Sequence, residues 1–179
     1  MSIVTELVQH FAYHVASRAV VAAALECSVN SEGIEIAGVG EGQRNYADLR
    51  LIKDMNGRVR LDIALCISLG GWLAECRLSP DQTSPLTDDD LMYILSKLDG
   101  ENDPMDGDAF DAMLRLKQEY PEAPDETLLA RYRDFEGQTL HLIDGLWPHI
   151  ETLAEKLLEK GKLSAGAVYM VMCRNGRFP

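Results

Sequence analysis

Two histidines near the start of the chain, His10 and His14, are four residues apart, and Glu6 stands one helical turn before His10. Side chains at this spacing lie on one face of a helix. Imidazole and carboxylate groups are ligands of zinc, so these residues could form part of a metal site. Histidines at this spacing also occur on helices that bind no metal, where they make ordinary hydrogen bonds. Both interpretations stay open at this point.

The residues around His14 also match part of a catalytic motif. Zinc proteases with an HExxH helix use two histidines as ligands and the glutamate as general base. Here the sequence after His14 has Val15 at the position of the glutamate and Arg18 at the position of the second histidine. Valine cannot accept a proton, and arginine keeps its charge and does not ligate a cation. We therefore expect no peptidase activity from this motif.

Several segments resemble the FtsH-type zinc metallopeptidases, which are the protease domains of membrane-anchored AAA+ machines. The similar segments follow one another in the family's order: AYHVASRAVVA at 12–22, the strand region 29–36, LGGWLAE at 69–75, TSPLTDDDL at 83–91 and WPHIETLAEKLLEKGKLS at 147–164. The chain has no GxxxxGK[S/T] motif and no apolar run long enough to cross a membrane. The resemblance therefore covers the peptidase domain without the ATPase and transmembrane parts.

The resemblance implies where the remaining site residues lie. Among the acids of the TSPLTDDDL segment, Asp90 matches the third zinc ligand best, and Glu75 is an acid that either ligates in its place or pairs with a neighbouring cation. The expected vestigial site contains five residues: His14, Val15, Arg18, Glu75 and Asp90.

We expect this site to hold no zinc or other cofactor, and Arg18 to take the place of the metal. Its guanidinium should then bind Glu75 or one of the consecutive acids at 88–90. The chain is thereby predicted to be a non-catalytic pseudopeptidase with a binding or assembly role. The alternative is a metal-dependent hydrolase with a rebuilt site, with ligands drawn from Glu6, His10, His14 and Asp90.

The composition restricts the partners. The 179 residues carry a formal net charge of -12, which disfavours nucleic acid and anionic membranes because both attract basic surfaces. A protein partner or self-association stays possible, and the family's rings imply the latter. No signal peptide is expected. Four scattered cysteines, Cys27, Cys66, Cys76 and Cys173, are predicted to be buried, reduced thiols of a cytoplasmic protein.

The hydrophobic pattern predicts a mainly α fold with a small β element, an α+β arrangement similar to the FtsH-type peptidase domain. We expect one domain over 1–179, with a zincin-like half at 1–100 and a helical part at 101–179. The expected helices span 2–27, 59–78, 109–119, 125–146 and 148–160, and Pro148 lies either in the first turn of the last of these or at a kink. Strands are expected at 33–37 and 46–52, a polar loop at 99–108 and a last short helix from 164. Thr87 is expected to cap a further helix. The glycine pair Gly70-Gly71 should mark a place where another group packs closely against its helix.

Overall fold

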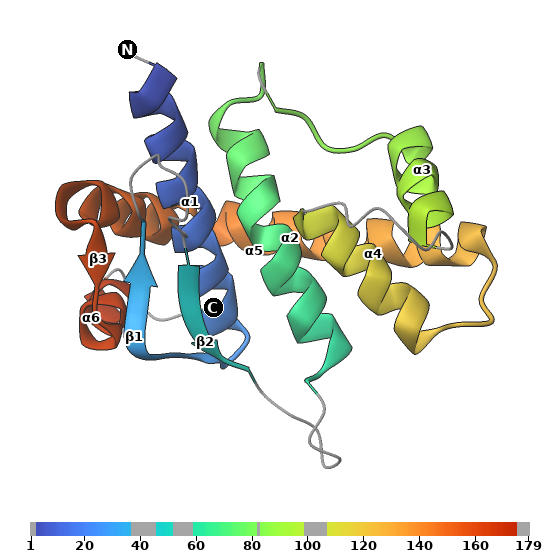
Figure 1. Cartoon of the computed structure of the whole chain (residues 1–179). Helices are drawn as coiled ribbons and strands as arrows, with labels where there is room; N and C mark the ends of the chain where they lie inside the picture. Colours follow the sequence, from blue (N-terminus) through green and yellow to red (C-terminus); the bar gives the residue numbers. More distant parts are fainter. Residues whose placement is uncertain (1–2, 37–45, 52–58, 82, 99–106, 175–179) are drawn as a thin grey trace.

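A computed structural model describes residues 3–36, 46–51, 59–81, 83–98 and 107–174. Helices make up most of this part of the chain, and a small antiparallel sheet lies at one side (Figure 1). The elements are α1 (Ile3–Ala24), β1 (Ser28–Glu35), β2 (Tyr46–Arg50), α2 (Leu61–Leu78), α3 (Asp88–Leu98), α4 (Asp108–Glu119), α5 (Asp125–Lys160), β3 (Lys162–Leu163) and α6 (Ala165–Arg174). The expected mainly α fold with a small β element is confirmed.

Helix α1 lies in the middle of the fold and packs against α2 and α5. Small residues on α1, including Ala12, Ala16 and Ala19, are fully buried, which lets the neighbouring backbones approach closely. The helix ends in a Schellman-type turn, in which the Cys27 amide donates to the carbonyl oxygen of Ala22 at 2.8 Å. Helix α1 therefore brings the residues on its N-terminal half against α2.

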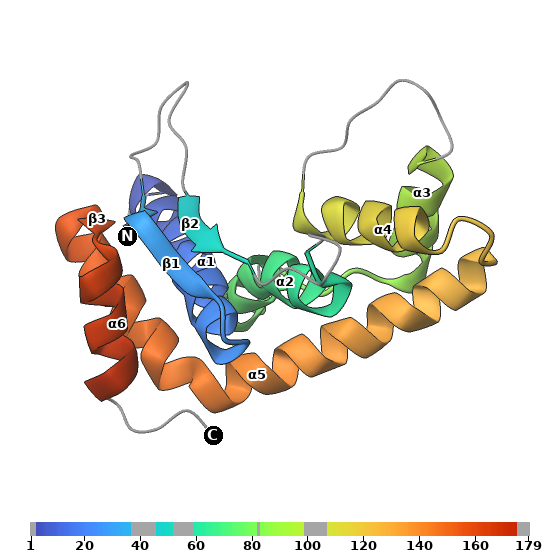
Figure 2. The same ribbon diagram turned by 90° about the horizontal axis from the view of Figure 1, so that it is seen from below.

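The sheet has the strand order β2-β1-β3 and covers one side of α1 (Figures 1 and 2). Strand β1 pairs antiparallel with both neighbours, and its register with β2 shifts between Val29 and Ile34. Gly33 has φ of +78°, and a Cβ on it would collide with the carbonyl oxygen of Leu163. Glycine is therefore required where β1 and β3 meet. The two-residue strand β3 was not expected from the sequence.

Helix α5 decides between two alternatives for Pro148. The sequence allowed this proline in the first turn of a separate helix or at a kink, and α5 is one helix of 36 residues that contains it. The expected division into two helices is therefore wrong. A proline inside a helix removes one hydrogen bond and costs about 3 kcal/mol. Fully buried side chains on both sides of it, among them Ile143, Ile150 and Leu153, offset that cost by packing into the core. Figure 2 shows α5 as a continuous ribbon that changes direction along its length, as a proline kink predicts.

The helix ends follow the expected capping. At the start of α3, the side chains of Thr87 and Asp90 each accept a hydrogen bond from the backbone amide of the other residue. Gly161 ends α5 with φ of +72°. At the start of α6, Ser164 accepts a hydrogen bond from the amide of Ala167. The polar loop expected at 99–108 lies outside the described residues except for its last two positions. No helix among the described residues is long and apolar enough to span a bilayer.

The cysteine prediction is correct for three of the four thiols. Cys27, Cys66 and Cys76 are buried, but Cys173 near the end of α6 is exposed. All four are free. Helix α6 has only ten residues. Its hydrophobic pattern is too short to predict from the sequence whether Cys173 is buried or exposed.

Candidate functional site

His14 projects from α1 onto the backbone of α2. A Cβ built on Gly71 would lie 2.5 Å from both Cε1 and Nε2 of the imidazole, a separation that real Cβ atoms do not adopt. At Gly70 the nearest atom to such a Cβ is Cγ2 of Val21, at 3.3 Å. The prediction that the glycine pair marks a close approach is therefore confirmed, and the approaching group is the imidazole of His14.

Carboxylates lie at both ring nitrogens of His14. Nδ1 is 2.6 Å from Oε1 of Glu75 on α2, and Nε2 is 3.5 Å from Oδ2 of Asp108 at the start of α4. A neutral imidazole has a single N–H, so it can donate to only one of these acids, whereas the imidazolium form donates to both. The ring thus links three helices that are distant in the sequence.

His10 lies one turn before His14 and contacts the same acid. Its Nδ1 is 3.5 Å from Oε2 of Glu75, and its Nε2 is 3.1 Å from Oγ of Ser79. The expectation that Glu75 pairs with a neighbouring cationic group is consistent with this geometry, because its two oxygens face two imidazoles. Glu6 lies one turn before His10, in the first turn of α1.

Asp108 is the first residue of α4, and its side chain is 13% exposed. Its Oδ2 accepts a hydrogen bond of 3.2 Å from the backbone amide of Trp72. Burial raises the pKa of the Asp108 carboxyl above its ordinary value, although the positive charges of His14 and Arg18 act in the opposite direction. The position of a carboxylate at a helix N-terminus is electrostatically favourable.

Arg18 contacts Asp108. Its guanidinium nitrogen NH1 is 3.5 Å from Oδ1 of this acid. The expected partners were Glu75 and the acids at 88–90, and the structure corrects this: within the described residues Arg18 forms no ion pair with any of them. Asp88 instead receives hydrogen bonds from Arg133 on α5, the shorter of them 2.6 Å.

The structure does not bring Asp90 to His14. The Asp90 carboxylate is exposed and accepts hydrogen bonds from the amide and the hydroxyl of Thr87, at 2.9 and 2.7 Å. These bonds lower the pKa of Asp90. Helix α3 packs on α4 and α5, and both views place it on the far side of α2 from α1 (Figures 1 and 2). Asp90 therefore acts as a helix cap, and the acids that face the HExxH-like segment are Glu75 and Asp108.

The remaining member of the expected site, Val15, is 1% exposed and belongs to the hydrophobic core. We name the group formed by His10, His14, Arg18, Glu75 and Asp108 the His14 cluster. Sequence reasoning missed Asp108, because it assigned the third acid to the segment that resembled the family. The available signal was the Gly107-Asp108 pair, which starts a helix after a polar loop.

The residues of the His14 cluster do not fit a zinc ion as they stand. Glu75 and Asp108 lie at opposite edges of the His14 ring, so their oxygens do not converge with a ring nitrogen on one point. A zinc site needs three or four ligands around one centre, and Arg18 occupies the position of the second histidine ligand. In the described part of the chain, no three His, Cys, Asp or Glu residues are arranged to hold a metal ion.

Further polar groups are buried behind the cluster on α5. Tyr132 is fully buried, and burial together with the charge of Glu136 raises the pKa of its phenol. Its hydroxyl has no hydrogen-bond partner among the described residues. Glu136 binds Arg133 through one oxygen at 2.7 Å, and its other oxygen is also without a partner there. This interior is thus more polar than the core around α1.

Comparisons of the sequence with the known protein families and with curated proteins found no match.

Proposed function

We propose that this chain is a non-catalytic relative of the FtsH-type zinc metallopeptidase domain, with a role in binding or assembly. The observation that carries the proposal is the position of Arg18. Its guanidinium binds Asp108, the same carboxylate that faces Nε2 of His14. A fixed side-chain cation thus stands one turn after the histidine, where a zinc protease of this kind has its second ligand.

Electrostatics explains why a cation is favourable there. Glu75 and Asp108 are both mostly buried, with side chains 20% and 13% exposed, and the charge of Glu75 adds to the cost of ionising Asp108. Carboxylates that are partly removed from water need a positive partner. Arg18 and the imidazolium form of His14 supply one, so the cluster can be stable without a metal ion.

The same geometry argues against hydrolysis. A metallopeptidase needs a polarised water and a general base beside the first histidine. Val15 offers no proton acceptor and its side chain lies in the core. Both nitrogens of His14 already face carboxylates. The cluster therefore has the properties of a structural link between helices.

Two arrangements support the proposed relationship to the peptidase fold. The helix that carries the HExxH-like segment packs on the helix that carries LGGWLAE, and Gly71 of that segment makes room for the first histidine. The position of the third acid departs from the expected alignment, since Asp108 replaces Asp90. Because the protease domains of the family assemble into rings, the partner would be a second copy of this chain or another protein in the cytoplasm.

Zinc binding by matched variants tests the proposal. We expect the purified wild-type chain to contain no stoichiometric zinc. Arg18→His should gain measurable zinc affinity by equilibrium dialysis, because it restores a second imidazole beside His14 and Asp108. Adding Asp108→Asn should abolish this gain, whereas adding Asp90→Asn should leave it unchanged.

Stoichiometric, tightly held zinc in the wild-type chain, or cleavage of casein with added zinc, would contradict the proposal. Such a result would favour the rebuilt metal site that uses His10 and His14. Sedimentation velocity tests the assembly role: we expect species larger than one chain at micromolar concentration. A protein that stays monomeric would refute self-assembly and leave a different protein as the partner.

A further inference from the structure

The two ends of the long helix α5 differ in charge. Helices α3 and α4 lie at its start and α6 lies at its end, so α3 and α6 stand at opposite ends of the molecule (Figures 1 and 2). In the sequence, residues 88–98 and 107–126 at the first end contain nine acids and three bases. Residues 156–174 at the second end contain four bases and one acid. A chain with a net charge of -12 therefore carries one positive end.

Exposed apolar side chains gather at the same two ends. Six large hydrophobic side chains are exposed in the described part of the chain, and five of them lie there. They are Met92 and Tyr93 on α3, Leu158 on α5, and Tyr169 and Met170 on α6. Isolated exposed apolar residues are ordinary on a protein surface, whereas neighbouring ones mark interaction sites. Each end thus combines apolar side chains with charge of one sign.

The outer face of α3 joins an acid to two apolar residues. Met92 and Tyr93 follow Asp89 by three and four residues, which places the three side chains on one face of the helix. All three are exposed, and Tyr93 is 54% exposed. The acids on either side of Asp89 are bound within the chain, but Asp89 forms no ion pair with a described residue. Lys97 lies over the Tyr93 ring, 5.2 Å from its centre, in the last turn of α3. We name Asp89, Met92 and Tyr93 the acidic face.

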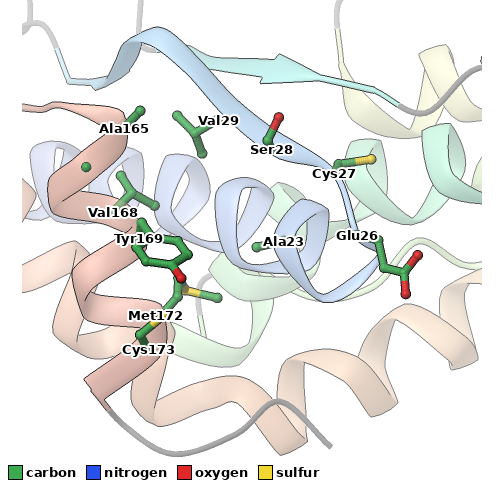
Figure 3. Close-up of a pocket in the computed structure, with 11 residues that line it drawn as sticks. Ala23, Glu26, Cys27, Ser28, Val29, Ala165, Val168, Tyr169, Met172 and Cys173 are labelled. Carbon is green, nitrogen blue, oxygen red and sulfur yellow. The ribbon is translucent and has the colours of Figure 1, made fainter.

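A groove of about 350 Å³ lies between the end of α5 and α6. One side of α6 faces the end of α1 and the start of β1, and Figure 3 shows Val168 and Met172 on that side. The groove lies on the other side of α6, and its apolar lining consists of Leu163, Ala167, Met170 and Val171. Met170 is 49% exposed, so the groove offers an apolar side chain that a partner can reach.

Two lysines of α5 line the same groove. Lys156 and Lys160 are one helical turn apart, and neither forms an ion pair with another described residue. Among the lysines of the described residues, Lys117 and Lys162 are the ones that form ion pairs. An unpaired ammonium group beside apolar surface favours a partner that offers both a carboxylate and apolar side chains. We name Lys156, Lys160 and the apolar lining the basic groove.

We propose that the basic groove of one copy of this chain binds the acidic face of a second copy, a contact that rests on the assembly role proposed above. Asp89 of one copy lies beside the two lysines of the other, and Met92 and Tyr93 pack against Met170. The partner is a second copy because the surface that complements the groove is present in the same chain and in equal number.

The two surfaces are different, so the contact is head-to-tail. Two acidic faces repel each other, as do two basic grooves, and this disfavours contacts between like surfaces. A contact of this kind closes as a reciprocal pair of copies or as a ring, or it continues as an open chain. In each of these assemblies, every contact needs one intact groove and one intact face.

Sedimentation velocity of the full chain and of two variants tests the proposal. Asp89→Asn with Tyr93→Ser removes the acidic face, and Lys156→Glu with Lys160→Glu reverses the charge of the groove. We expect the wild-type chain to associate at micromolar concentration, and each variant to associate at least tenfold more weakly. Leu7→Ser is the matched control, because Leu7 is the sixth exposed hydrophobic residue and belongs to neither surface. This control variant should associate as the wild type does.

A mixture of the two variants tests whether the two surfaces bind each other. Each variant keeps the surface that the other lacks, so the groove of one variant can bind the face of the other. We expect the equimolar mixture to form a one-to-one complex, although each variant alone stays monomeric at the same concentration. Contacts between like surfaces would give no such complex.

A mixture in which both variants stay monomeric would overturn the proposal. Wild-type assembly that persists in both variants would overturn it as well, and would keep the assembly role on another surface. A wild-type chain that stays monomeric would overturn this contact and self-assembly together, while zinc analysis tests the pseudopeptidase separately. Circular dichroism of each variant establishes that a loss of association does not come from unfolding. The single substitutions Asp89→Asn and Lys160→Glu replace a double variant that does not fold.

Discussion

Replacement of Gly71 by alanine tests the geometry of the His14 cluster most directly. In an exposed helix interior, Gly→Ala stabilises a protein by about 1 kcal/mol, because alanine loses less conformational freedom on folding. At Gly71 the added methyl group would lie 2.5 Å from the His14 ring. The ring cannot turn aside freely, since Nδ1 is held at 2.6 Å by Glu75.

The expected cost follows from these contacts. Overpacking of a well-packed position costs about 1–3 kcal/mol, and loss of a hydrogen bond to a charged group costs about 1.5–3 kcal/mol. Set against a gain of about 1 kcal/mol from helix propensity, Gly71→Ala should lower the free energy of unfolding by about 1.5–5 kcal/mol. At Gly70 the nearest atom is 3.3 Å away on Val21, so Gly70→Ala should be close to neutral.

Urea denaturation followed by circular dichroism measures these changes. Gly137→Ala on α5 is the control, because its added methyl group would meet no atom within 4 Å, and it should stabilise the protein by about 0.5–1 kcal/mol. The ¹⁵N spectrum of the His14 imidazole should change in Gly71→Ala and stay the same in Gly137→Ala. If Gly71→Ala stabilises the protein as much as Gly137→Ala does, His14 does not lie against this glycine and the description of the cluster is wrong.

Three further predictions concern the acids and their partners. Arg18→Ala should lower the free energy of unfolding by about 1–2 kcal/mol. This is less than the full value of about 1.5–3 kcal/mol for a charged hydrogen bond, because Arg18 is 35% exposed and water screens the pair. Arg18→Lys should recover part of the loss, and equal stability of wild type and Arg18→Ala in urea would contradict the ion pair. The folded-state pKa of Asp108 is raised, so its contribution to stability is present below its unfolded pKa and is lost as the pH rises through the folded value. Relative to wild type, Asp108→Asn should therefore become more stable as the pH rises through this interval. If the difference in free energy of unfolding between the two proteins is constant from pH 3 to 7, the pKa of Asp108 is not raised. Tyr132→Phe removes a buried hydroxyl that has no partner among the described residues, so thermal unfolding should show equal or greater stability, whereas a loss above about 1 kcal/mol would indicate an interaction of that hydroxyl.

The sequence predicted those features that depend on local pattern. The periodicity of α1 and α2, the Thr87 cap and the Gly161 end are set by neighbouring residues, and all appear where expected. The close approach at Gly71 was predicted because two helical glycines need a compensating contact. The partner of Arg18 depends on how α4 folds back onto α1, which no local pattern encodes. The continuity of α5 through Pro148 likewise depends on packing against the rest of the core.

The positive side chains of the His14 cluster can balance the charge of its two carboxylates without a metal ion. When both nitrogens of His14 donate, its imidazolium and the Arg18 guanidinium carry two positive charges opposite the carboxylates of Glu75 and Asp108. A divalent ion would supply the same charge to the same acids. The charge of a divalent ion would lie at one point, however, whereas the charges of the two side chains lie one turn apart along α1. The carboxylates can then stay apart, one on α2 and one at the start of α4, and each is bound by its own cation. Charge balance of this kind holds three helices together and leaves no open coordination position, which is why a link between helices is the role that this geometry favours.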